Sequence, residues 1–392
     1  MRRTELLQEI RIMRFEEVFS RWTEKSLTQE EAAGILGVCS RSFRRYIERY
    51  EGYGQEGLRD KRLSQASHRR APVDEVIALV GLYESRYGGW SVKHFHSWYR
   101  REGGKRSYGW VKNMLQAKGA VVKAPRRGAH RKRRPRAPLE GMMLHQDGST
   151  HEWVPGKHWD LIITMDDANS RHYSMFFVEQ EGTSSSFRGV RDVIVKKGLF
   201  CSLYTDRGTH YWFTPKAGAK VSTTQPTQFG RAMGQLGIEL IAAYSPQARG
   251  RSERAFGTHQ QRLPRELALH KITTMEAANR YLAEVYMPAF NSEFTQPTIE
   301  KGSAFVKWAG ANLDYILCEQ YERTVRADNC VVFEGLELQI PPNRYRCHYV
   351  RAKVRVHRYS DGSLAIFHGP RKLAAYDALG NYKHKEKKAV TA

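Results

Sequence analysis

The chain has 392 residues, with 64 Lys and Arg against 41 Asp and Glu, so its formal net charge is +23. This length allows about two to four domains, and this charge indicates a polyanionic partner, for which DNA is the expected candidate. No apolar run approaches the ~20 residues of a membrane-spanning helix, and the N-terminus lacks the apolar core of a signal peptide. The five cysteines are scattered without a CxxC pair. That scatter argues against a disulfide framework and a structural zinc site, and it favours a reducing cytoplasm.

Residues 27–50 have the pattern of a helix-turn-helix. Thr28 is placed to cap a first helix, with Glu31 three residues further on, and Gly37 permits the turn that follows. The buried stripe expected on this helix is Ala32, Ile35 and Leu36.

The second helix of this pair is expected over 41–50, with Ser40 as its cap. Arginines recur along its outer face, and a recognition helix uses such residues on base edges and phosphates. The residues expected to contact DNA here are Ser40, Arg41, Arg44 and Arg45. The alternative is an ordinary helical hairpin with a solvated basic face.

A second helical unit is expected over 72–120. Apolar residues keep helical spacing from Val76 to Tyr83, and another helix begins after Ser107 and ends near Gly119. The unit looks like a second helix-turn-helix, although its tryptophans are equally compatible with a plain core: Trp90, Trp98 and Trp110.

Residues 123–136 contain eight basic residues, no acid, and interspersed Pro and Gly, so they predict a linker. We favour a strap that follows DNA phosphates over a simple tether. The phosphate contacts expected in this strap are Arg126, Arg127, Arg131, Lys132, Arg133 and Arg134.

Strand and helix signals alternate from 138 to about 295. Strands are expected leading into Asp147 and over 159–165, 173–178, 200–204 and 239–243. Helices are expected over 183–197, capped by Thr183, and over 227–236, stopped by Gly237. The segment 211–225 is expected to be either a flexible lid over DNA or a surface loop without a role in the reaction. Pro264 is expected to kink or end the last helix.

Three carboxylates lie in distinctive settings in this region. Asp147 stands in Asp147-Gly148-Ser149, Asp206 ends an apolar run in 204–208, and Glu253 follows the Pro/Gly-rich turn 245–250. Three such oxygens converging at one sheet edge would hold a pair of Mg²⁺ ions for attack on a phosphodiester.

These blocks resemble those of the DDE transposases that share a retroviral-integrase catalytic core, in particular the ISNCY branch of bacterial insertion sequences. The resemblance covers most of the chain, but the N-terminal zinc module of retroviral integrases is missing. It implies an RNase H-like core with Asp147, Asp206 and Glu253 as catalytic residues and metal ligands. It also implies two Mg²⁺ ions per site, replaceable by Mn²⁺, and a nucleoid-associated bacterial enzyme that cuts at terminal inverted repeats and joins the 3′-OH to target DNA.

Other interpretations stay open at this point. The tandem Asp166-Asp167 is a possible metal signature, but a turn in which Asp caps the backbone is favoured. A DNA-binding transcriptional regulator with a degenerate core, or an RNase H-type nuclease, are the alternative functions. Because two element ends must be handled together, a DNA-dependent dimer or larger even assembly is expected.

The region 326–375 predicts a small all-β domain, with strands over 329–333, 336–340, 353–359 and 364–367 and a hairpin turn at Asp361-Gly362. We expect an SH3-like barrel with DNA contacts from Lys353 and Arg355, besides Arg254 in the core; a barrel for protein contacts only is the alternative. The expected organisation is therefore multidomain: 1–67 helix-turn-helix, 68–122 second helical unit, 123–137 basic linker, 138–302 RNase H-like α/β core, and 303–392 β-barrel with basic tail.

Overall fold

The computed structural model describes residues 3–61, 71–123, 135–215, 220–222, 224–244, 246–310, 312–343 and 346–383, apart from the side chains of 3–5 and 246–249. The chain divides into two compact units, 1–84 and 85–392. The predicted phosphate contacts between Arg126 and Arg134 lie outside the described residues.

The first unit is helical. It contains α1 (Arg3–Thr23), α2 (Gln29–Leu36), α3 (Ser40–Tyr53), α4 (Gln55–Leu58) and most of α5 (Val73–Arg86). Its core joins α1 to the helix-turn-helix through six buried residues: Phe15, Val18, Ala32, Ala33, Phe43 and Ile47. The long helix α1 is not part of the sequence prediction, and it supplies two of these six core side chains.

The helix-turn-helix prediction is confirmed in outline and wrong in two details. Thr28 and Glu31 form the expected capping box, and Gly37 ends α2 in the left-handed conformation. Ile35, however, is 44% exposed, because the buried stripe passes through Ala33 instead. Ser40 is the first residue of α3 rather than its cap, since Cys39 has the extended backbone of the capping position.

The second unit begins with α6 (Val92–Arg101) and α7 (Tyr108–Ala117), capped by the hydroxyls of Ser91 and Ser107. Trp90 is buried and its ring stacks on that of His94, with 3.9 Å between centroids. The plain-core interpretation therefore holds for Trp90.

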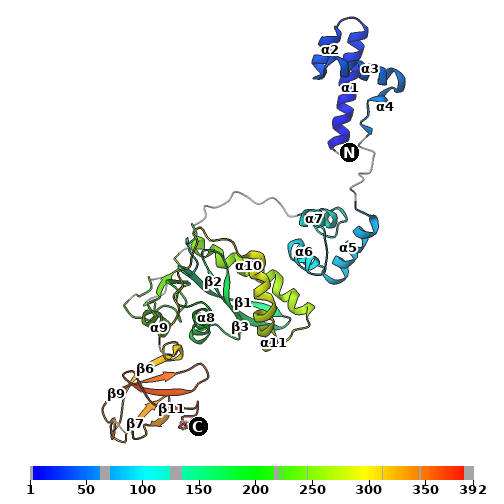
Figure 1. Ribbon diagram of the computed structural model, residues 1–392. Coiled ribbons are helices and arrows are strands. Elements are labelled where there is room, and N and C mark those ends of the chain that lie inside the picture. The colour runs from blue at the N-terminus through cyan, green and yellow to red at the C-terminus, as the bar shows by residue number, and fades with distance from the viewer. Residues whose placement is uncertain are drawn as a thin grey trace, which may run out of the picture. The chain divides into compact units, whose positions relative to one another are not determined.

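A five-stranded sheet forms the centre of the second unit, with strand order β3-β2-β1-β4-β5 (Figure 1). β1 (Met143–Val154), β2 (Lys157–Asp166) and β3 (His172–Val178) form an antiparallel meander. β4 (Ser202–Thr205) pairs parallel with β1, and β5 (Glu239–Ala242) pairs parallel with β4. Three antiparallel strands followed by two parallel ones, with a helix at each crossover, is the order expected for an RNase H-like core.

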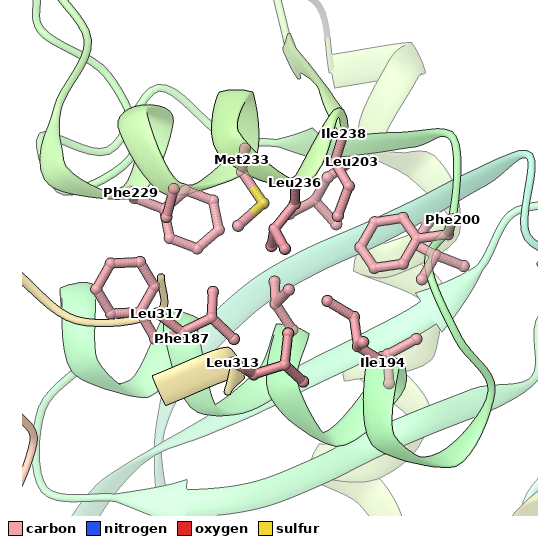
Figure 2. Close-up of a cluster of buried hydrophobic side chains, with 14 of the residues drawn as sticks. Phe187, Ile194, Phe200, Leu203, Phe229, Met233, Leu236, Ile238, Leu313 and Leu317 are labelled. Carbon is pink, nitrogen blue, oxygen red and sulfur yellow. The ribbon is translucent and has the colours of Figure 1, made fainter. Parts of the chain in front are cut away.

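One face of the sheet is covered by α8 (Thr183–Lys196) and α9 (Gln228–Leu236). Figure 2 shows their apolar side chains, among them Phe187, Phe229 and Met233, converging with Leu203 of β4. Gly237 ends α9, as predicted, while Thr227, predicted as its first residue, is its cap. Thr183, predicted as the cap of α8, is its first residue, and Gly182 is the cap.

The other face is covered by α10 (Pro246–Leu269), α11 (Met275–Tyr281), a π-helical turn (Leu282–Tyr286) and α12 (Met287–Phe294). Pro264 is predicted to kink or end this helix; it does not end it, because α10 continues to Leu269. Leu263 and Leu267 are fully buried on either side of Pro264, and their packing offsets the hydrogen bond that the proline removes.

The C-terminal part is all-β. A four-stranded sheet has the order β11-β10-β9-β6, and β7 pairs with β8 in a separate hairpin. The closed barrel is not confirmed in the described residues, since these two sheets share a core but are not hydrogen-bonded into one cylinder. The sequence prediction lacks two of the strands, β6 and β11. The bounds are β6 (Glu319–Thr324), β7 (Cys330–Phe333), β8 (Leu336–Gln339), β9 (Lys353–Arg358), β10 (Leu364–His368) and β11 (Arg371–Tyr376).

Within the described ranges, no helix combines the length and the apolar character needed to cross a membrane.

Candidate active site

Asp147 lies on the central strand β1, and its side chain is on the sheet face that α10 covers. It pairs with Ile163 of β2 across the antiparallel ladder, and Ile163 belongs to the core beneath α10; directly opposed residues of a ladder share a face. The residue is 7% exposed, and its Oδ1 accepts a hydrogen bond from the Gly148 N–H at 3.1 Å.

Asp206 follows the end of β4 and stands level with Asp147. His145 pairs with Tyr204 in the parallel ladder of β1 and β4, and each aspartate lies two residues further along its strand. Because side chains alternate with a period of two, both aspartates extend the face of His145 and Tyr204. The Gly208 N–H donates to Asp206 Oδ1 at 2.9 Å.

The pKa of Tyr211 is affected by the negative charges of these two aspartates. Burial first, and then the negative charges of Glu181, Asp147 and Asp206, raise the pKa of its fully buried phenol well above its ordinary value. Its hydroxyl donates to Gln146 Oε1 at 3.1 Å. Three carboxylates, those of Glu181, Asp147 and Asp206, therefore lie close enough to this phenol to raise its pKa.

Glu181 is a further carboxylate beside the pair that the sequence prediction lacks. Its Oε2 lies against Gly148, so a Cβ at this position would require the Glu181 carboxylate to shift. His210 Nε2 lies 3.4 Å from the Oε1 atom of Glu181. Glu181 comes from the loop before α8, where periodicity gives no signal, and the glycine after Asp147 is the one hint in the sequence.

Glu253 is carried by α10, which runs along β1 in the same direction. Near its start, Arg251 contacts Asp167, whose Oδ1 also lies 2.7 Å from Nε2 of His145 on β1. Two turns later, Gln260 Nε2 donates to Ser149 Oγ at 3.0 Å. Glu253 lies between these two ties, as Asp147 lies between His145 and Ser149.

Helical geometry places Glu253 on the side of α10 that faces β1. Seven residues separate it from Gln260, close to two full turns, so the two share one face of the helix. Glu253 is nevertheless exposed. Among the described residues, no group of three or more His, Cys, Asp or Glu lies close enough to hold a metal ion. The strand register thus puts Asp147 and Asp206 on one face of the sheet, and Glu253 is exposed on the helix that covers this face.

The tandem aspartates after β2 have structural roles, as the turn interpretation predicts. Asp166 accepts hydrogen bonds from the N–H groups of Gly141 and Ala168, at 2.8 and 2.7 Å, and burial raises its pKa. Asp167 accepts from the Ala137 N–H at 2.7 Å. Both side chains are buried among these donors.

The residues predicted to contact DNA are exposed where the structure describes them. Arg41, Arg44 and Arg45 are exposed on α3, whereas Ser40 is half-buried, and Arg254 is exposed next to Glu253. On β9, Lys353 pairs with Glu322 at 2.9 Å and Arg355 donates to Gln320 Oε1 at 3.4 Å. These two cations of β9 are therefore shared with neighbouring side chains of β6.

Comparison with known proteins adds three findings. Residues 16–70 match a family described as a helix-turn-helix domain. A putative transposase, y4bF of Sinorhizobium fredii, is 26% identical over 355 residues, which cover 89% of this chain and 77% of that protein. The transposase for insertion sequence IS1202 of Streptococcus pneumoniae is 32% identical over 203 residues, which cover 52% of this chain and 43% of that protein.

Solved structures give only a distant likeness. The catalytic core domain of HTLV-2 integrase with magnesium matches 37% of this chain and 84% of its own, with a TM-score of 0.29 and 14% identity. A simian T-cell lymphotropic virus intasome bound to a PP2A regulatory subunit matches 78% of this chain and 98% of its own, with a TM-score of 0.33 and 13% identity. The assignment of an RNase H-like core therefore rests on the strand order of the sheet and not on these two structures.

Proposed function

The chain is a homologue of insertion-sequence transposases, and on that premise we propose that it cuts DNA at the ends of its own element. It would bind the terminal inverted repeats, expose a 3′-OH there and join that hydroxyl to target DNA. The observation that supports this most is that Asp147 on β1 and Asp206 directly after β4 each lie two residues beyond the paired His145 and Tyr204, on the sheet face that the helix carrying Glu253 covers.

The residues fit a divalent metal by their chemistry. Carboxylate oxygens are the ligands of Mg²⁺, and the negative charge around Tyr211 is what a bound cation would neutralise. We assign Asp147, Asp206 and Glu253 as ligands of two Mg²⁺ ions, with Mn²⁺ as a substitute, and Glu253 has to turn inward to join the pair. When bound, the ions supply Lewis-acid stabilisation of the phosphoryl transition state.

The chain's own residues prepare the site for a polyanion. The N–H groups of Gly148 and Gly208 each hold one aspartate oxygen, which orients the two carboxylates. Arg207 and Arg254 are exposed immediately beside Asp206 and Glu253. Their charges lower the repulsion between the acidic site and the approaching phosphates.

DNA recognition is assigned to the parts outside the core. The exposed arginines of α3 suit the major groove and its phosphates. The basic linker and the cations Lys353 and Arg355 suit additional backbone contacts. Because one site cuts one strand, two ends require at least two copies, and we assign a DNA-dependent dimer or larger even assembly.

A second candidate is a DNA-binding transcriptional regulator with a degenerate core. The observation that favours it is the absence of a three-ligand metal group among the described residues. Such a protein would bind the same ends and perform no cleavage in any metal.

The deciding experiment uses a labelled duplex from the boundary of the element and a supercoiled plasmid. With MgCl₂, the protein should nick the duplex at the element end and join the labelled strand to the plasmid, and EDTA should abolish both. Binding without nicking in Mg²⁺ or Mn²⁺ would establish the regulator instead.

A further inference from the structure

Asp167 is a buried carboxylate that joins three separate segments of the core. It is 1% exposed. Its Oδ1 lies 2.7 Å from His145 Nε2 and accepts a hydrogen bond from the Arg251 guanidinium, while its Oδ2 accepts from the Ala137 N–H at 2.7 Å. Donors from the start of the core, from β1 and from α10 therefore meet on a single side chain.

The charge of Asp167 is stabilised in place. Burial alone would raise the pKa of this carboxyl, but the hydrogen bonds from His145 and Ala137 and the positive charge of Arg251 hold the pKa well below its usual range. A buried carboxylate that stays ionised binds its donors more strongly than a neutral group would. The tie to Arg251 is therefore charge-assisted.

The partners of Asp167 lie next to the catalytic residues. His145 is two residues before Asp147 on β1, on the same face of the strand. Arg251 is two residues before Glu253 on α10. Its guanidinium also donates to the Pro135 carbonyl at 3.0 Å, so the first turns of the helix are held from two directions.

We propose that Asp167 is a positioning residue that fixes the start of α10 so that Glu253 can reach Asp147 and Asp206. This inference rests on the proposed function. Two other polar contacts from α10 to the sheet lie six and seven residues beyond Glu253, at His259 and Gln260, or about 10 Å along the helix. Without the Asp167 carboxylate, Arg251 keeps its hydrogen bond to the Pro135 carbonyl but loses its charge-assisted link to the residue that also contacts His145 of β1.

A role as a metal ligand does not suit Asp167. Both of its oxygens are already occupied by hydrogen bonds from three donors, which a cation would have to displace. Its effect on the reaction therefore has to pass through Arg251 and His145.

The test compares Asp167→Asn and Arg251→Gln in the full-length protein, with Asp166→Asn as the matched control. Asp166 is equally buried in the same turn, but the contacts described above tie it to Gly141 and Ala168. Cleavage of the labelled end should fall on the order of 10–100-fold in both test variants. The Mg²⁺ concentration for half-maximal cleavage should rise, while affinity for end DNA stays unchanged.

Coupling separates positioning from general instability. The double variant Asp167→Asn/Arg251→Gln should be no slower than the slower single variant, because both remove one tie. Asp166→Asn should lower the melting temperature and keep the Mg²⁺ midpoint. If the wild-type protein cleaves and Arg251→Gln keeps its rate and midpoint, Asp167 is not a positioning residue; if the wild type does not cleave, the proposed function itself is wrong.

Discussion

The Nε2 atoms of His172 on β3 and His259 on α10 lie 3.1 Å apart, and both imidazoles are buried. The proton positions follow from the neighbours. His172 Nδ1 lies 3.1 Å from the Ser170 carbonyl, which can only accept, so Nδ1 carries the proton and Nε2 accepts from His259. His259 Nδ1 is then an acceptor for the Tyr286 hydroxyl at 2.9 Å. This series of hydrogen bonds, from the Ser170 carbonyl to the Tyr286 hydroxyl, is complete only while both histidines are neutral.

This pair predicts an acid-sensitive fold. Burial lowers the pKa of His172 to about 4, and burial followed by the charges of His172 and Arg262 lowers that of His259. The unfolded chain therefore binds more protons between about pH 6.5 and pH 4, so stability falls as the pH drops through that window. His172 alone should cost about 2 kcal/mol between pH 7 and pH 5.

Urea unfolding at pH 7 and pH 5 measures this effect. His158→Gln, which replaces an exposed imidazole, is the control and should keep the wild-type pH slope. His172→Asn should show a smaller slope. An equal slope in wild type and His172→Asn would mean that the buried pair does not titrate in this window.

Much of the core is predictable from local signals. Buried apolar runs predict β2 and β3, and Thr28 and Ser107 mark the starts of two helices, because these signals act within a few residues. The helix α1 also carries such a signal, since Phe15, Val18, Phe19 and Trp22 recur at helical spacing and pack on one core.

The supporting contacts of the site are not predictable in this way. Asp167 meets His145 and Arg251 across 22 and 84 residues of sequence, and Glu181 reaches Gly148 from another loop. Such contacts join residues that are far apart in the sequence, so a pattern within a few neighbouring residues cannot predict them. The predicted closed barrel is not confirmed for the same reason, because the pairing of the C-terminal strands depends on packing between the sheets.

The catalytic assignment predicts the effect of three amide substitutions. Asp147→Asn, Asp206→Asn and Glu253→Gln each replace a carboxylate by a group that binds Mg²⁺ poorly. Each should lower cleavage and joining by at least about 100-fold while affinity for end DNA stays near wild type. Glu276→Gln, at an exposed glutamate of α11, is the matched control. Normal turnover in any of the three variants, measured on end oligonucleotides, would remove that residue from the site.

The helix-turn-helix assignment predicts the effect of Arg44→Ala/Arg45→Ala. Both side chains are exposed on α3, so their loss should weaken binding to the element's ends. Base contacts should cost ~1–3 kcal/mol on the cognate sequence, and phosphate contacts should weaken binding to all DNA equally. Arg21→Ala, on α1 and ion-paired with Glu17 at 3.4 Å, is the control. Unchanged gel-shift affinity for every sequence would show that α3 faces away from DNA.

A buried hydrogen bond between His94 and Glu266 predicts that α6 is docked on α10. His94 Nε2 and Glu266 Oε1 are 2.6 Å apart, and Glu266 Oε2 accepts from the Tyr281 hydroxyl at 2.6 Å. Burial would raise the pKa of Glu266, but the hydrogen bonds from His94 and Tyr281 hold it below its usual value. Glu266→Leu leaves two buried donors without an acceptor and should cost about 3 kcal/mol.

Denaturant unfolding and hydrogen exchange measure this docking together. In Glu266→Leu, the amides of α6 should exchange faster, since α6 loses its tie to α10. Glu276→Leu, at an exposed position, should change stability by less than about 0.5 kcal/mol. Wild-type exchange of α6 in Glu266→Leu would show that the pair does not hold the two helices together.

The last prediction concerns assembly, and the charge of +23 motivates it. Without DNA, repulsion between copies should keep the protein monomeric at low salt, because like charges within about 10 Å are poorly screened there. Paired end DNA neutralises that charge and brings two copies together, so light scattering should show a dimer or larger even species with end DNA. The effect should weaken as salt rises. Random DNA of equal length is the control for non-specific binding. A protein that stays monomeric with saturating ends, yet joins both ends efficiently, would contradict the assembly.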